Sequence, residues 1–124
     1  MNKPAQVRKL NLRRLTCDLD LSAQEIEALL DLAAEVKRNP AAYGSHLAGR
    51  CLALLFEKPS LRTRITFEVA VHQLGGYSIL HAGPVAEREP VKDVARNLAR
   101  WTDCIAARTF SQGTIEELAR WSAV

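Results

Sequence analysis

A chain of 124 residues, of which 48% are apolar and 25% charged, has the length and composition of a single globular domain. The composition excludes a disordered chain, and a domain of this length buries roughly two-thirds of the surface that its unfolded chain exposes. The longest apolar run, residues 51–56, is far shorter than the about 20 residues of a membrane-spanning helix, so we expect no membrane partner.

The net charge of +3 comes from the N-terminus. Residues 1–16 hold five basic residues and no acidic one, which leaves 12 basic and 14 acidic residues in the rest of the chain. That remainder shows no basic cluster beside aromatic residues, so we expect no nucleic-acid partner. We interpret residues 1–20 as a basic N-terminal arm and residues 21–124 as the folded domain.

The three cysteines, Cys17, Cys51 and Cys104, are odd in number and form no CxxC pair, which disfavours a disulfide framework or a zinc site. Cys51 and Cys104 each begin an apolar segment, where a reduced cysteine behaves as a small buried side chain. Reduced cysteines favour a cytoplasmic location. The three histidines lack the spacing of metal ligands, and we predict neither a metal nor a cofactor.

The first predicted helix begins at Ser22, which forms a capping box with Glu25, and ends at Asn39-Pro40. Its apolar residues recur at helical spacing: Ile26, Leu29, Leu30, Ala33 and Val36. The apolar run at residues 51–56 predicts a strand buried on both faces.

Residues 62–74 predict a second helix, ended by Gly75-Gly76. The stripe expected to face inward consists of Ile65, Thr66, Val69 and Leu74.

Residues 77–81 predict a second strand, and residues 82–89 a polar loop before the helix-starting Pro90. The helix after Pro90 carries an apolar stripe formed by Val91, Val94, Ala95, Leu98 and Trp101. Residues 104–110 predict a third strand. Thr114 and Glu117 then predict a capping box for a helix that continues to near Val124.

One helix followed by three strand–helix units predicts an α/β fold, a parallel sheet with helices on both faces. The chain stops where a fourth strand would be expected, so we interpret it as the front part of a longer α/β protein or as one half of a two-domain one.

Ligands of an open parallel sheet bind beyond the carboxyl ends of its strands. The loop after the first strand leads there into a helix start, whose unpaired N–H groups suit a phosphate or carboxylate. Ser60 and Thr63 add hydroxyl groups, Arg62 adds a planar guanidinium, and Arg108, near the end of the third strand, lies at the same edge. Ser60 and Thr63 could equally be simple helix caps, and the arginines could face water. Arg64 and Glu68 have the spacing of an ion pair on the helix.

Residues 52–68, LALLFEKPSLRTRITFE, resemble the carbamoyl-phosphate loop of the ornithine and aspartate carbamoyltransferases, and the lead-in FEKPS is similar to the ornithine branch. Residues 88–98, REPVKDVARNL, are similar to the second signature of the family, and residues 107–110 to its next strand end. The resemblance implies the N-terminal carbamoyl-phosphate domain, lacking its last elements.

The resemblance also implies the site. Ser60, Arg62 and Thr63, with the backbone of Leu61, would hold the phosphate of carbamoyl phosphate, and Arg108 would bridge the phosphate and the carbamoyl oxygen. Arg62 and Arg108 would be the catalytic residues. In the family, the ornithine δ-amine attacks the carbamoyl carbon and phosphate leaves, without metal, nucleotide or covalent intermediate, in what the resemblance suggests is a homotrimer.

Two departures accompany the resemblance. The chain ends before the His-Pro-Xaa-Gln motif and before the amino-acid-binding domain, so we expect ornithine to bind through that missing domain and the chain alone to be inactive. The loop between Gly76 and Arg88 is shorter than in the family, which leaves its contact to a neighbouring subunit without a match. Three alternatives remain open: an aspartate-type domain, a non-catalytic anion-binding module, and a truncated chain that folds poorly.

Overall fold

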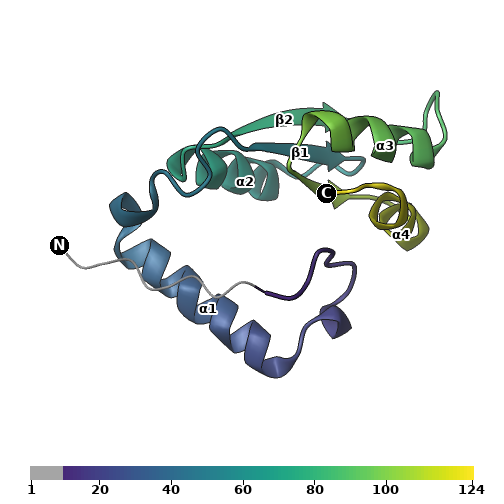
Figure 1. Ribbon diagram of the computed structural model, residues 1–124. Coiled ribbons are helices and arrows are strands. Elements are labelled where there is room, and N and C mark those ends of the chain that lie inside the picture. The colour runs from purple at the N-terminus through teal and green to yellow at the C-terminus, as the bar shows by residue number, and fades with distance from the viewer. Residues whose placement is uncertain (1–9) are drawn as a thin grey trace.

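The computed structural model describes residues 10–124 and shows a three-stranded parallel sheet with helices on both faces (Figure 1). The strands β1 (Cys51–Phe56), β2 (Tyr77–Ala82) and β3 (Cys104–Arg108) lie in the order β2-β1-β3. The long helices are α1 (Ala23–Arg38), α2 (Leu61–Gln73), α3 (Val91–Trp101) and α4 (Gln112–Trp121), and short 3-10 turns span Asp18–Asp20 and Pro40–Tyr43. The predicted α/β class and strand–helix alternation are confirmed.

The central strand β1 is buried along its whole length, as its unbroken apolar sequence predicted. Its side chains alternate between two core clusters. On one face, Leu55 contacts the loop before α3 and the helices α3 and α4, in a cluster with Val85, Val91, Ala95 and Leu118. On the other face, the β1 side chains Leu52, Leu54 and Phe56 pack with Val71 of α2.

The inward stripe predicted for α2 is wrong. Ile65 and Val69 are 43% and 48% exposed, whereas Val71 is buried. Arg64 and Glu68 lie on the same side of the helix as Val71 and are half-buried. Apolar residues are spread around α2, so periodicity could not select its inner face, and the aliphatic stems of long charged side chains can cover a sheet as methyl groups do.

The start predicted for α4 is also wrong. The helix begins at Gln112, and the Oγ of Ser111 accepts a hydrogen bond from the N–H of Gly113 at 3.1 Å. Thr114 and Glu117 therefore lie inside the helix rather than at its cap, and the helix ends at Trp121. The preceding strand stops at Arg108, two residues earlier than predicted, because the chain has to turn before Ser111.

The capping box predicted for α1 is confirmed. The N–H of Ser22 donates to Glu25 at 2.9 Å, and the N–H of Glu25 donates to the Ser22 Oγ at 3.3 Å. Helix α1 nevertheless contains no buried residue, and Leu30 in its apolar stripe is 65% exposed. The helix lies away from the sheet (Figure 1), so its stripe does not join either core cluster.

Residues 1–9 of the predicted arm lie outside the described residues. Just beyond them, the Arg14 guanidinium donates to the Ser122 carbonyl at 3.2 Å, and the Gln112 amide donates to the Thr16 carbonyl at 3.0 Å. The segment around residues 14–16 therefore contacts both ends of α4.

Of the cysteines expected to be buried, Cys51 is buried and Cys104 is exposed, because it stands at the start of the edge strand β3. The three thiols are free. Within residues 10–124, no helix combines the length and the apolar character that crossing a lipid bilayer requires.

Candidate functional site

The first turn of α2 is open at the carboxyl edge of the sheet. Ser60 precedes the helix and its carbonyl accepts the N–H of Arg64 at 3.1 Å, but its side chain makes no capping hydrogen bond. The N–H groups of Leu61, Arg62 and Thr63 precede the first helical hydrogen bond and have no partner within the helix. Since these three residues are exposed, the helix start is not covered by the described part of the protein.

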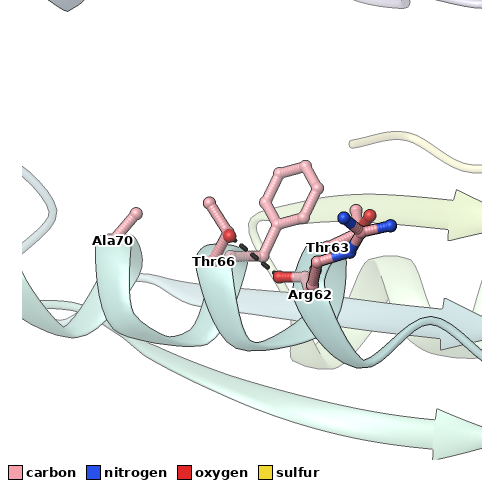
Figure 2. Close-up of a pocket in the computed structure, with 5 residues that line it drawn as sticks. Arg62, Thr63, Thr66 and Ala70 are labelled. Atoms are coloured by element: carbon pink, nitrogen blue, oxygen red, sulfur yellow. Dashed lines mark hydrogen bonds between the residues drawn. The ribbon is translucent and has the colours of Figure 1, made fainter.

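A shallow hollow of about 500 Å³ continues from this turn along the exposed side of α2 (Figure 2). It is lined by Arg62, Thr63, Thr66, Phe67 and Ala70. Figure 2 shows Arg62 and Thr63 at the helix end toward which the strand arrows point, with their side chains on the same side of the helix. The Thr66 hydroxyl donates to the Arg62 carbonyl at 2.8 Å, so the Thr63 hydroxyl and the Arg62 guanidinium are the polar groups that remain for a ligand.

Arg108 lies at the same edge and on the same face of the sheet as α2. In the β1–β3 ladder its Cα is the partner of Phe56, whose side chain packs beside α2. Ala106, two residues earlier on β3, packs against the same cluster. Because side chains alternate along a strand, Arg108 stands on the face of Ala106 and Phe56.

The site carries an excess of positive charge. Arg62 and Arg64 lie in the first turn of α2, which has no acidic residue, and cations there oppose the helix dipole. Arg64 contacts Glu68, with Nε and Oε1 at 3.9 Å, as its spacing predicted. Among residues 10–124, Arg62 and Arg108 form no ion pair. Two guanidinium groups and a helix start at one sheet edge can bind a doubly charged anion.

The structure thus gathers Ser60, Leu61, Arg62 and Thr63 in one open turn and brings Arg108 to the adjacent strand end. No hydrogen bond within residues 10–124 joins Arg108 to that turn, so a ligand between them would be the link. A cluster of three His, Cys, Asp or Glu side chains suited to a metal ion is absent from these same residues.

Sequence reasoning gave no role to Glu57, which lies between the strand and the open turn. Its carboxylate accepts the N–H of Val85 and the N–H of Phe110, both at 2.9 Å. Lys58 then contacts the Phe110 ring, with Nζ at 5.1 Å from the ring centroid. The sequence feature that could have drawn attention to Glu57 was its position, an acidic residue directly after a buried strand at the carboxyl edge of the sheet.

Residues 13–124 match the family model described as the carbamoyl-phosphate-binding domain of aspartate/ornithine carbamoyltransferase. The ornithine carbamoyltransferase of Vibrio sp. (strain 2693) is 48% identical over 108 residues, which are 85% of this chain and 36% of that protein. The chain therefore spans about a third of the length of the curated relatives that it matches.

Solved structures agree with the sequence matches. The ornithine carbamoyltransferase of Thermus thermophilus has 47% sequence identity and a TM-score of 0.83, over 93% of this chain and 41% of that chain. The enzyme from Pyrococcus furiosus has 36% identity and a TM-score of 0.85, over 90% of this chain and 37% of that chain.

A parallel sheet with an open, cationic helix start at its carboxyl edge defines an anion-binding α/β domain. The family match makes this more specific. The chain belongs to the aspartate/ornithine carbamoyltransferase family, and its residues 13–124 match the carbamoyl-phosphate-binding domain.

Proposed function

We propose that this chain is the carbamoyl-phosphate-binding part of an ornithine carbamoyltransferase, with the site at the start of α2. The single observation that carries the proposal is the open first turn of α2, where Ser60 does not cap the helix and Leu61, Arg62 and Thr63, whose N–H groups have no partner within the helix, are exposed residues. A phosphate at this point would accept these N–H groups and the Ser60 and Thr63 hydroxyls, and the Arg62 guanidinium would bind two of its oxygens.

Arg108 would bridge the phosphate and the carbamoyl oxygen. When an amine attacks the carbamoyl carbon, negative charge develops on the carbamoyl oxygen and on the leaving phosphate. Fixed cations and N–H donors directed at those atoms stabilise this charge because they need no reorganisation during the reaction. Arg62 and Arg108 are therefore the proposed catalytic residues, and Ser60, Leu61 and Thr63 the proposed binding residues.

The acceptor of the carbamoyl group is proposed from the relatives, whose names specify ornithine. The reaction would join the ornithine δ-amine to the carbamoyl carbon and release phosphate, giving citrulline for arginine metabolism. This chain spans only about a third of such relatives, so we expect ornithine to bind through a second, amino-acid-binding domain and the chain alone to be inactive.

We further propose a homotrimer in the cytoplasm. Free thiols at Cys17, Cys51 and Cys104 support a reducing compartment. Exposed apolar side chains on α2 and β2 support association between copies, because they would lose their contact with water in an interface: Ile65, Phe67, Val69, Tyr77, Ile79 and Leu80.

Titration of the 124-residue chain with carbamoyl phosphate, followed by the backbone amide signals in NMR spectra, tests the site. We expect saturable shifts at Leu61, Arg62, Thr63 and Arg64, and a similar response to inorganic phosphate at higher concentration. Shifts confined to other parts of the chain, or no saturable shifts, would contradict the proposed function.

A further inference from the structure

We propose that Glu57 is a positioning residue of the carbamoyl-phosphate site and that it acts through Arg108. The inference rests on the proposed function, because it concerns the same site. Its basis is a pair of hydrogen bonds that join the two loops flanking the end of β1: the Glu57 carboxylate accepts the N–H of Val85 on one side and the N–H of Phe110 on the other, both at 2.9 Å.

The carboxylate continues the hydrogen bonding of the sheet beyond the strands. At the end of β1 the backbone already contacts both neighbours: the Phe56 carbonyl accepts the N–H of Gly83 at 3.0 Å, and the N–H of Glu57 donates to the Arg108 carbonyl at 2.9 Å. The Glu57 side chain then accepts the next N–H groups that the ladder pattern would use, those of Val85 after β2 and Phe110 after β3. A carboxylate suits this position because it offers two acceptor oxygens and no donor.

These contacts hold the segment that carries Arg108 at both ends. The Arg108 carbonyl accepts the backbone N–H of Glu57, and the Phe110 N–H donates to the Glu57 carboxylate. The next residue, Lys58, adds a contact from its ammonium to the Phe110 ring at 5.1 Å. The backbone around the proposed bridging arginine is thereby fixed to the same short segment, residues 57–60, that leads into the phosphate-binding turn.

The arrangement also explains how an acidic residue can stand beside an anion site. An unpaired carboxylate would repel a phosphate, whereas the charge of Glu57 is directed at two backbone N–H groups that stabilise it. Loss of these two bonds would release the loop at Val85 and the segment that follows Arg108 at once, and would leave Arg108 held only by its backbone bond to Glu57. Groups that bind a ligand have to be held within about 0.5 Å of their productive positions, so this release would weaken ligand binding.

A double-mutant cycle with Glu57→Gln and Arg108→Ala tests this coupling, measured as the dissociation constant for carbamoyl phosphate from the amide shifts of the native state. Only native signals are read, so a smaller folded fraction does not change the constant. We expect Glu57→Gln to weaken binding about five- to tenfold in the otherwise unchanged chain and less than about twofold when Arg108 is already alanine.

The matched control is Asp103→Asn. Like Glu57, Asp103 is a carboxylate that accepts a backbone N–H at the end of the sheet, that of Cys51 at 2.9 Å. It lies at the opposite edge, where the strands begin. We expect it to lower stability without changing the dissociation constant. If Glu57→Gln does not fold, Lys58→Met removes the other contact to Phe110 and should show the same dependence on Arg108 with a smaller effect.

The outcomes separate the two proposals. If the unchanged chain does not bind carbamoyl phosphate, the proposed function fails. If the chain binds, three results for the dissociation constant would overturn the inference and leave Glu57 a structural residue. Glu57→Gln could leave the constant unchanged, change it equally with and without Arg108, or change it no more than Asp103→Asn does.

Discussion

Arg62 stands in the first turn of α2, where its positive charge opposes the helix dipole and forms no ion pair among the described residues. Arg64 in the same turn has a carboxylate partner in Glu68, with Nε and Oε1 at 3.9 Å, although its buried Nε makes no hydrogen bond among the described residues. The cost of an unpaired cation at a helix start is recovered when an anion binds there. The proposed ligand thus explains a local arrangement that helix propensity alone does not.

We therefore expect Arg62→Ala to weaken carbamoyl-phosphate binding at least tenfold, since a charge-assisted hydrogen bond contributes about 1.5–3 kcal/mol. Isothermal titration calorimetry measures the change. Arg100→Ala is the control, because it removes the same charge from an exposed position in the last turn of α3. Equal affinities in the two variants would show that Arg62 contributes only net charge.

Asp103 predicts a pH dependence of stability. The N–H of Cys51, and secondly the Arg50 guanidinium, hold the pKa of the Asp103 carboxyl below its ordinary value of 3.8. A carboxyl whose pKa is lower in the folded state contributes stability that is present above pH 3.8 and is lost as the pH falls through the folded-state pKa.

Urea unfolding at pH 7 and at pH 3 checks this. We expect Asp103→Asn to be less stable than the unchanged chain at pH 7, with a smaller difference at pH 3, whereas Asp31→Asn on the exposed side of α1 should change little at either pH. A difference between Asp103→Asn and the unchanged chain that stays constant with pH would contradict this assignment.

Helices α1 and α4 begin with the same kind of cap but contribute differently to the core. Ser22 caps α1, which buries no residue, whereas Ser111 caps α4, which places Leu118 in the core at 4% exposure. A serine cap contributes about 1 kcal/mol to its helix. We expect Ser111→Ala to lower the global free energy of unfolding by about this amount.

Ser22→Ala should instead increase hydrogen exchange in the first turn of α1 and leave the global transition nearly unchanged, because an unpacked helix can fray alone. Chemical unfolding and amide hydrogen exchange distinguish the two effects. Thr114→Ala is the comparison at the position where the sequence suggested a cap. A larger loss of stability from Thr114→Ala than from Ser111→Ala would contradict the assigned start of α4.

Sequence patterns predicted the elements where one periodicity dominated. The unbroken apolar run at residues 51–56 identified the buried strand, and Val91 and Ala95 on α3 are buried as their spacing indicated. The sequence prediction was wrong at the inner face of α2 and at the start of α4. The inner face of α2 combines the buried Val71 with the half-buried Arg64 and Glu68, and the cap of α4 is a serine that has Thr114, rather than Glu or Gln, three residues later.

The site was predictable in part for the same reason. Its residues are contiguous in the chain from Ser60 to Thr63, so the motif could be read directly. The position of Arg108 depended on strand order and register, which place it beside Phe56. The contacts of Glu57 join loops 28 and 53 residues away. The sequence places Glu57 directly after a buried strand, but local patterns do not indicate which distant N–H groups its carboxylate binds.

At the scale of the whole molecule, the exposed apolar side chains of α2 and β2 predict self-association. Sedimentation velocity over a range of concentrations should show a discrete trimer of about 41 kDa, three times the chain mass of 13.8 kDa. A charge introduced by Val69→Lys should shift it toward the monomer, because Val69 is 48% exposed on α2. A broad distribution of large species that binds a hydrophobic dye would instead indicate a poorly folded chain.

The open turn of α2 and Arg108 together are proposed to bind carbamoyl phosphate rather than any small anion. The ratio of the dissociation constants for inorganic phosphate and carbamoyl phosphate tests it most directly, in the unchanged chain and in Arg108→Ala. We expect the unchanged chain to prefer carbamoyl phosphate about tenfold and the variant to lose that preference, because a charged hydrogen bond to the carbamoyl oxygen is removed. A ratio that is the same in both chains would contradict the account and favour a general anion-binding module.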